Sequence, residues 1–333
     1  MPVKSPFDAS TTIAKPGQGR VILSLLPPSL PSLSTLTYQY PLKLVTRSPE
    51  FIPESSVLQD ATRPVHLHLL SYGGGLLPGD VLDVSIRLEP RTRLVLTTPQ
   101  GTTKIYKTSA DGNAADTSKQ SLNVQVENEA ALCYLPDPSV PFRDSRYEQV
   151  QTFTISMDDA DKGSASSICV LDWVTQGRGS LGEDWDFNLW RGKNEVWTVM
   201  DDKKKAKKLL LRDSVVLKRD NPYGIRDLVF PHGVVGTLIL YGPVFEHLSF
   251  FIMDTFTGQP RIGARNWSSS STTTPAESTV DEVIWTAARV RAGFVLVKFG
   301  AKGFEAGKAW LGDLLRKEGS VAREFGEEAL WSL

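Results

Sequence analysis

The chain contains 333 residues, of which 41% are hydrophobic and 23% are charged, and its formal net charge is −1. This composition predicts a soluble globular protein with a large core, and the nearly balanced charge argues against nucleic acid or an anionic membrane as a partner. No stretch reaches the roughly 18 apolar residues of a membrane span, and the first 20 residues lack the apolar segment of a secretory signal. The two cysteines stand apart in apolar stretches, as in reducing compartments, so we expect a cytoplasmic protein.

Alternating apolar and polar residues predict β-strands along most of the chain. In residues 80–89, for example, Leu82, Val84 and Ile86 would face one side of a sheet and the polar residues between them the other. The remaining runs are residues 20–25, 37–46, 64–70, 93–98, 121–129, 147–156, 167–175, 195–200, 236–242, 248–254 and 293–300. They are short and separated by Gly, Pro, Asn and Asp, which predicts a mainly β protein.

Helical periodicity is clear only near the C-terminus. Residues 304–318 space Ala306, Trp310 and Leu314 over about three turns and end in basic residues, which predicts an α-helix. Residues 281–290 are a weaker helix candidate. We therefore expect about two α-helices in an otherwise β-rich chain.

Three segments interrupt these patterns. Residues 27–33 (PPSLPSL) indicate a stiff Pro-rich connector, residues 110–119 a flexible loop, and residues 267–280, which are almost entirely Ser, Thr, Pro, Ala and Glu, a disordered insertion. None of them separates two compositions, and no internal repeat is evident. The predicted organisation is a flexible N-terminal lead (1–19), one β-rich domain (20–320) and a C-terminal tail (321–333).

The stretch SYGGGLLPGD (71–80) contains four glycines and suggests a phosphate-binding loop at first sight. A P-loop requires a lysine and a hydroxyl residue after the last glycine, whereas Gly79 is followed by Asp80, whose charge would repel phosphate. The stretch also joins two predicted strands and opens no helix, so no helix N-terminus could hold an anion. The sequence therefore predicts that this chain binds no nucleotide.

Enzyme signatures are also missing. There is no G-x-S-x-G elbow, and neither cysteine has an activating neighbour in sequence. His66 and His68 share one strand face and could chelate a metal, but a pair of solvent-facing strand histidines is the favoured interpretation. Asp80, Asp137 and Glu183 lie in Gly/Pro-rich loops, where they could serve function or cap their own turns. The residue pattern alone leaves this choice open.

Several stretches in the same order resemble the UreD family of urease accessory proteins, called UreH in some bacteria. The resemblance spans roughly residues 20 to 315, and the Ser/Thr-rich insertion and long N-terminal lead look like a eukaryotic, fungal version. The stretches that carry it are YPLKLV (40–45), SYGGGLLPGD (71–80), LTTPQGTTKIYK (96–107), LPDPSVPFRDSRYEQ (135–149) and GRGSLGE (177–183).

The resemblance implies a stacked, β-helix-like arrangement of strands with a couple of α-helices. It also implies a scaffold without catalytic turnover, which joins a UreF-type accessory protein and a UreG-type GTPase to apo-urease. Nickel would then pass to the dinuclear metal centre of urease. Hydrolysis of nucleotide would belong to the GTPase partner.

The residue inventory agrees with a transit role for nickel. A high-affinity site would need clustered His or Cys, whereas a route that releases the ion needs weak oxygen ligands. On this resemblance Asp80, Asp137 and Glu183 are expected to line a nickel path. Residues expected to dock partners or support those carboxylates are Lys104, Tyr106, Arg143 and Arg178. The family often has an Ala-Arg pair where this chain has Ser180 and Leu181, so no role transfers to those two positions.

Two other functions remain open at this level. A β-helical carbohydrate-active enzyme would use paired carboxylates, but the chain shows neither a secretory signal nor a repeated β-helix motif. A metal-independent interaction module would recruit partners through its loops alone.

Overall fold

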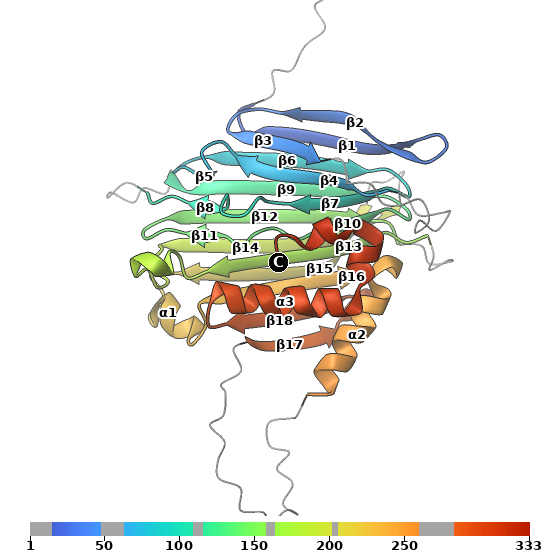
Figure 1. The fold of residues 1–333 in the computed structure, drawn as a ribbon. Coiled ribbons are helices and arrows are strands. Elements are labelled where there is room, and N and C mark those ends of the chain that lie inside the picture. The colour runs from blue at the N-terminus through green and yellow to red at the C-terminus, as the bar shows by residue number, and fades with distance from the viewer. Residues whose placement is uncertain (1–14, 48–62, 109–115, 158–163, 202–205, 260–282) are drawn as a thin grey trace, which may run out of the picture.

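The computed structural model of the protein describes residues 15–47, 63–108, 116–157, 164–201, 206–259 and 283–333. Two large β-sheets lie face to face, and helices cover the outer face of one of them (Figure 1). The first sheet contains, in spatial order, β15 (Ala206–Lys218), β14 (Leu189–Asp201), β12 (Arg146–Ile155), β9 (Ser118–Val126), β6 (Val81–Leu88), β1 (Gln18–Leu26) and β2 (Leu30–Tyr38).

The second sheet has eight strands and a third, small sheet has three. In spatial order, the eight-stranded sheet contains β17 (Val283–Arg289), β18 (Val295–Ala301), β16 (Val234–Tyr241), β13 (Ser167–Thr175), β10 (Ala131–Tyr134), β7 (Arg93–Thr97), β4 (Val65–Ser71) and β3 (Leu42–Arg47). The small sheet contains β11 (Val140–Pro141), β8 (Lys104–Ile105) and β5 (Gly75–Leu76).

The middle of the chain winds through the three sheets in turn. Strands β4, β5 and β6 form one coil, β7, β8 and β9 the next, and β10, β11 and β12 a third, and each strand pairs in parallel with its counterpart in the following coil. This is the predicted β-helix-like stacking. Successive coils begin at Val65, Arg93, Ala131 and Ser167. Because loops of different length give this uneven spacing, no fixed repeat is visible in the sequence.

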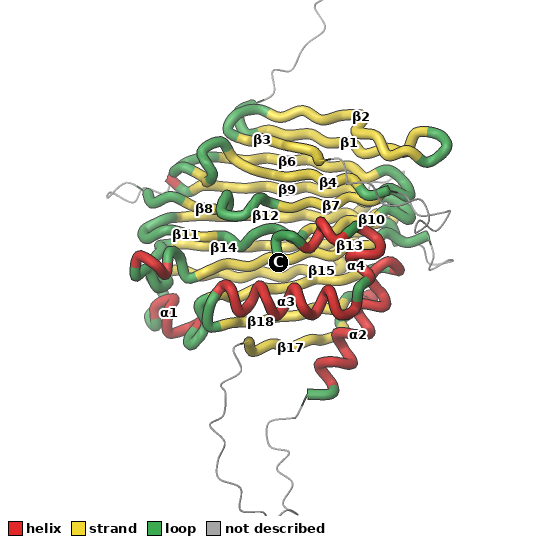
Figure 2. The backbone as a smooth tube through the Cα atoms, viewed as in Figure 1, coloured by secondary structure: helices red, strands yellow, loops and turns green. Residues whose placement is uncertain are grey.

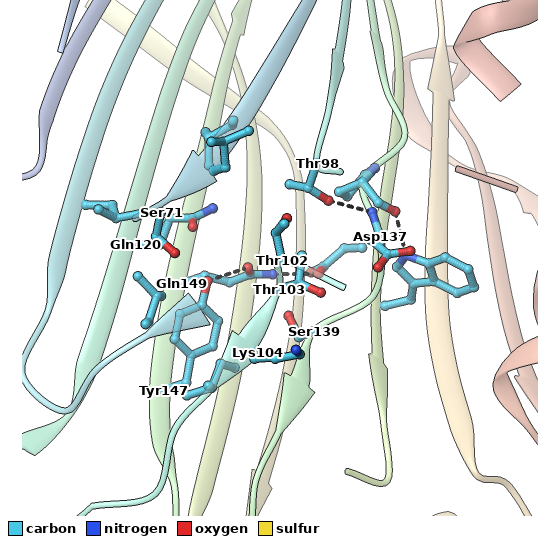
Figure 3. A pocket seen from close by; sticks show the side chains of 18 of the residues that line it. Ser71, Thr98, Thr102, Thr103, Lys104, Gln120, Asp137, Ser139, Tyr147 and Gln149 are labelled. Carbon is cyan, nitrogen blue, oxygen red and sulfur yellow. Dashed lines mark hydrogen bonds between the residues drawn. The ribbon is translucent and has the colours of Figure 1, made fainter. Parts of the chain in front are cut away.

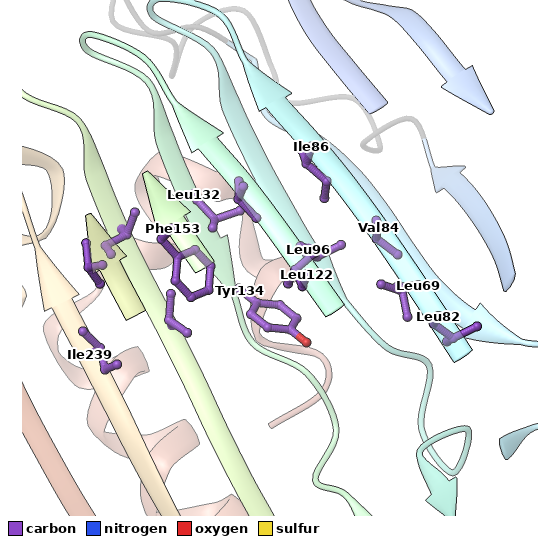
Figure 4. Packing of buried hydrophobic residues seen from close by; sticks show 14 of the residues in the cluster. Leu69, Leu82, Val84, Ile86, Leu96, Leu122, Leu132, Tyr134, Phe153 and Ile239 are labelled. Carbon is purple, nitrogen blue, oxygen red and sulfur yellow. The ribbon is translucent and has the colours of Figure 1, made fainter. Parts of the chain in front are cut away.

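The main core lies between the two large sheets (Figure 4). Strand β12 buries every second residue, as its alternating sequence predicts, and Phe153 is fully buried there. A second core lies between the eight-stranded sheet and the helices, where Trp173, Phe299 and Leu315 are buried. Every residue of β13 is buried because this strand has a core on each face.

Figure 2 shows the helices gathered on one part of the molecule. The helix predicted at residues 304–318 is confirmed as α3 and ends at Gly319, whose φ of 83° suits glycine. The other α-helices are α1 (Gly224–Val229), α2 (Glu246–Thr257) and α4 (Ser320–Phe325). Short 3-10 turns include η3 (Gly179–Leu181), η4 (Pro243–Phe245), η5 (Arg291–Gly293) and η6 (Glu327–Leu330).

Two local predictions were wrong in element type. Residues 248–254, predicted as a strand, lie in α2, where Leu248 and Ile252 are buried one turn apart. A short apolar run fits either element, and packing on the sheet decides between them. Residues 281–290, a weak helix candidate, contain β17, whose Trp285 ring contacts the rings of Phe256 and Trp310.

Two segments that were predicted as a connector and a C-terminal tail are also part of the folded structure. The Pro-rich segment 27–33 forms the turn between β1 and β2 and the start of β2, with Leu25 paired to Pro31. The predicted C-terminal tail, 321–333, is packed into the second core, where Val321, Phe325 and Leu333 are buried. These side chains are too apolar to be left in water. Most of the N-terminal lead and of the 110–119 loop, and the whole 267–280 insertion, lie outside the described residues.

Candidate functional site

A small cavity lies between the two large sheets, and its lining includes Lys104 and Ile105 of β8 (Figure 3). The volume open to the centres of water molecules is about 50 Å³, enough for roughly three waters. Its polar lining comes from strands of all three sheets and from the loops that connect them. These polar residues are Ser71, Thr98, Thr102, Thr103, Lys104, Gln120, Asp137, Ser139, Tyr147, Gln149, Gln151 and Asp172.

Asp137 is the predicted path residue that lines this cavity. Its side chain is only 5% exposed, and one carboxylate oxygen, Oδ2, accepts a 2.8 Å hydrogen bond from the backbone N–H of Gly101. The backbone N–H of Asp137 donates to the Thr98 hydroxyl at 2.7 Å. The other oxygen, Oδ1, is buried without a hydrogen-bond partner among the described residues. Burial raises the pKa of Asp137, and the Gly101 bond opposes that rise.

A second buried carboxylate, Asp172, was missed by the sequence analysis. Gln149 Nε2 donates to its Oδ1 at 2.5 Å and Asn194 Nδ2 to its Oδ2 at 2.7 Å. Burial raises the pKa of Asp172 to about 6, although these two bonds favour the ionised form. Asn194 pairs across the sheet with Asp213, whose Oδ1 binds Lys298 Nζ at 2.6 Å. A row of polar side chains therefore runs from the cavity to the Lys298 ammonium.

Two sequence signals could have located this row. Tyr147, Gln149 and Gln151 alternate in β12 on the same face as Phe153, so polar groups stand where the pattern predicts core. Asp172 is the one charged residue within the otherwise apolar run SICVLDWV. Polar residues on a core face need partners from another element, which the sequence does not reveal.

The titration of Asp172 leads to a first prediction. The folded pKa of about 6 exceeds the usual 3.8, so the folded state binds this proton more tightly than the unfolded state. Stability should therefore fall as pH rises from about 4 to 6, by up to about 3 kcal/mol. In Asp172→Asn, urea unfolding should lose this part of the pH dependence. Equal pH slopes for the two proteins would contradict the prediction.

The other predicted loop residues form one chain of contacts. Glu183 is 4% exposed, and Arg178 Nε lies 3.1 Å from both of its carboxylate oxygens. The Arg178 guanidinium lies 3.8 Å from the Phe142 ring centre, and the Phe142 ring meets Tyr106 edge to face at 5.2 Å. The Tyr106 hydroxyl donates to Gly73 O at 3.3 Å. The loop of Glu183 is thereby joined to the glycine stretch.

Arg143 lies beside this chain of contacts. Its guanidinium pairs with Asp186 at 3.1 Å, and its backbone N–H donates to Glu183. Burial alone would raise the pKa of Glu183, but the bonds from Arg178 and Arg143 outweigh it and leave the pKa lowered. Glu183 is therefore an ionised, fully paired carboxylate, in contrast to Asp137.

Removal of the Arg178 charge gives a second prediction. Arg178→Met should destabilise the fold by about 2 kcal/mol, between the values for exposed and buried ion pairs, because Glu183 would stay buried without an opposite charge. The double variant with Glu183→Gln should recover part of this loss. Because the folded pKa of Glu183 is lowered, the Arg178–Glu183 pair stabilises the protein above the unfolded pKa, and this stabilisation is lost as pH falls. The difference in free energy of unfolding between Arg178→Met and wild type should therefore be smaller in acid. Urea unfolding at pH 7 and pH 4 measures both effects, and additive single effects would contradict the coupling.

Asp80 and the glycine stretch form a compact turn. Asp80 Oδ2 accepts a 2.8 Å bond from Leu77 N–H, so this carboxylate caps its own turn. Gly73 and Gly74 have φ of 88° and 72°, with open space where a Cβ would lie. Gly75 approaches β8 closely, because an added Cβ would lie 2.6 Å from Lys104 O. The stretch thus serves a left-handed turn and a close strand approach.

The two strand histidines are placed differently from the expectation. His66 is buried, and its Nε2 lies 3.0 Å from Phe325 O of the C-terminal segment. His68 is half-buried, so the two histidines are not the solvent-facing pair that the sequence favoured. Within the described ranges, no group of three or more His, Cys, Asp or Glu side chains could hold a metal ion. Nor does any helix there combine the length and hydropathy needed to cross a bilayer.

The fold and the site together define a β-helical protein with a narrow, oxygen-lined cavity between its sheets. A family model described as "UreD urease accessory protein" matches residues 19–331. The chain belongs to this family, in agreement with the resemblance of its motifs.

Curated relatives point the same way. Urease accessory protein 4 of Cryptococcus neoformans var. grubii is 32% identical over 70% of this chain and 74% of its own length. An uncharacterized ureD-like urease accessory protein of Schizosaccharomyces pombe is 30% identical over 88% of this chain and 91% of its own. Urease accessory protein D of Oryza sativa subsp. indica is 30% identical over 65% of this chain and 62% of its own length.

Proposed function

We propose that this chain is a cytoplasmic urease maturation scaffold without catalytic turnover. It joins UreF-type and UreG-type accessory proteins to apo-urease and gives nickel a path to the dinuclear centre of the enzyme. Membership of the urease accessory protein D family supports the class of function. The observation that supports the nickel path is Oδ1 of Asp137, which is buried in the cavity between the sheets and has no hydrogen-bond partner among the residues that the structure describes.

The chemistry of the cavity suits passage better than storage. Apart from the Lys104 ammonium, its charged and polar side chains carry carboxylate, amide and hydroxyl oxygens, which bind nickel more weakly than imidazole or thiolate. Asp137 would offer one open oxygen, and Asp172 a second carboxylate further inside. Glu183 would shape the nearby loop through Arg178, and Asp80 would hold the glycine turn. Nickel is here a cargo that the chain releases.

Deletion of the gene in the source organism tests the class of function. Urease activity should be lost at ordinary nickel and partly regained in excess nickel, because free metal can load some apoenzyme without a guide. Co-purification of the tagged chain should recover the two accessory partners and urease subunits. Full urease activity in the deletion strain would refute the proposal.

The two alternative functions gain no specific support. Coiled β-strands serve many unrelated activities, so the fold does not by itself favour a carbohydrate-active enzyme. A metal-independent module would not need a buried, open carboxylate oxygen in a polar cavity, because such a group costs free energy to desolvate.

A further inference from the structure

Large apolar side chains stay exposed around the short helix α1. Ile225 and Val229 of α1 point into the core, whereas the neighbouring apolar side chains face solvent. The set, named here the α1 patch, consists of Leu181 (65% exposed), Tyr223 (72%), Leu228 (49%), Phe230 (74%) and Ile284 (54%).

Two polar contacts join the segments that carry the α1 patch. Arg226 of α1 lies 2.8 Å from Asp184, three residues after Leu181. Trp185 Nε1 donates to His232 O at 3.0 Å, which holds the same loop against the end of the segment bearing Phe230.

The patch continues onto the edge strand β17. The His232 ring lies against Gly300, where an added Cβ would meet the ring at 2.6 Å. Gly300 pairs directly with Ile284 on β17, so the ring and Ile284 are neighbours on one sheet face. That face of β17 points away from the helices and is open to solvent at Ile284, Thr286 and Ala288. In Figure 1, β17 and α1 both lie at the end of the molecule opposite the β1–β2 turn.

Size distinguishes the α1 patch from scattered surface residues. At these exposures, five large side chains present on the order of 600 Å² of apolar surface, the upper end for a monomer. A standard interface buries about 800 Å² on each partner, so the patch could supply most of one. Two exposed aromatic side chains are typical anchors of such interfaces.

The charges around the patch indicate the kind of partner. Arg178 is paired with Glu183, Arg226 with Asp184, and Arg143 with Asp186. Arg219–Asp144 and Lys218–Asp220 are paired as well. These charges are compensated within the chain, and Asp227 of α1 adds an exposed carboxylate beside Leu228. The surface therefore has an apolar centre and a polar rim in which most charges are paired, as in a protein–protein interface.

We infer that the α1 patch docks a protein partner that presents an apolar face of matching size. The inference rests on the proposed function, which supplies the class of partner, an accessory protein of the same maturation complex. A partner seated here contacts η3 through Leu181, and η3 belongs to the loop that Arg178 and Glu183 fix. Docking is thereby placed beside the loops that carry the predicted site residues.

The test uses the full chain co-expressed with the UreF-type partner of the same organism. The variant Leu228→Ser with Phe230→Ser removes the centre of the α1 patch, and Leu30→Ser, at 56% exposure on β2, is the matched control at another surface. We expect at least a tenfold weaker complex for the double variant and less than a twofold change for the control. Unchanged thermal unfolding of both proteins shows that the fold is intact.

Each other outcome counts against the inference. Equal affinity of wild type and double variant overturns it while leaving the proposed function standing. A wild-type chain that is dimeric alone, and monomeric once Phe230 is replaced, assigns the patch to a second copy and also overturns it. Failure of the wild-type chain to bind the partner at all refutes the proposed scaffold function, and the docking inference falls with it.

Discussion

Asp137→Asn should lower urease activation at limiting nickel by at least tenfold while leaving the fold intact. Asparagine keeps an oxygen to accept the Gly101 N–H bond and fills the same space, so packing in the loop is preserved. It removes the negative charge and replaces the open oxygen with an amide group, which does not bind a divalent cation as a carboxylate does. Excess nickel should restore part of the activity.

The control for this variant is Asp83→Asn. Asp83 is a half-buried carboxylate on β6 that does not line the cavity. Its replacement should leave activation within twofold of wild type. Thermal unfolding of the purified proteins separates loss of function from loss of fold, and full activation by Asp137→Asn at limiting nickel would exclude Asp137 from the path.

The three predicted path carboxylates should differ in their effects. Glu183→Gln should act on stability and loop position, because Arg178 already neutralises Glu183. Asp80→Asn should have a small effect, since its oxygen can still accept the Leu77 N–H bond. Equal loss of nickel loading in all three variants would instead favour a path in which each carboxylate binds the ion.

Phe325→Ala should destabilise the protein by about 3–5 kcal/mol, the usual cost of removing a buried phenylalanine. Phe325 is fully buried, and its ring stacks on Phe245 with centres 5.6 Å apart. Its carbonyl oxygen also lies within hydrogen-bond distance of His66 on β4. The C-terminal segment thus ties the helical layer to the eight-stranded sheet, and thermal unfolding should shift down by roughly 4–9 °C.

Trp331→Ala is the matched control in the same segment. Trp331 is 57% exposed, and the Arg47 guanidinium lies 4.6 Å from its ring centre. An exposed cation–π contact is worth about 0.5–1 kcal/mol, so this variant should change stability by no more than that. Equal effects of the two substitutions would mean that residues 321–333 behave as the tail predicted from the sequence.

Strong periodicity was a reliable guide to this fold. The alternation in β6, β9 and β12 and the helical spacing of α3 each determine which side chains must face a core. Short apolar runs were unreliable, because residues 248–254 fit a strand as well as the helix they form. Residues 321–333 were misjudged because their apolar side chains are too few and too irregularly spaced to indicate a packed segment.

For the site, the loops could be located from the sequence but the state of each carboxylate could not. Asp80, Asp137 and Glu183 are alike in sequence as acidic residues in Gly/Pro-rich turns. In the structure, Asp80 caps a turn, Glu183 is paired with Arg178, and Asp137 keeps an open oxygen in a cavity. Asp80 and Glu183 are bound by residues 3 and 5 positions away in their own loops, whereas the Gly101 N–H that binds Asp137 lies 36 residues away, on the preceding coil.

The sequence by itself determined the mainly β class, the family and the loops that carry the proposed site residues, because these follow from local alternation and motif order. Only the tertiary structure decided which carboxylate is open, that Asp172 joins the cavity, and where the apolar surface gathers. Each of these depends on side chains from distant segments, and their desolvation and pairing are set by the stacking of the coils.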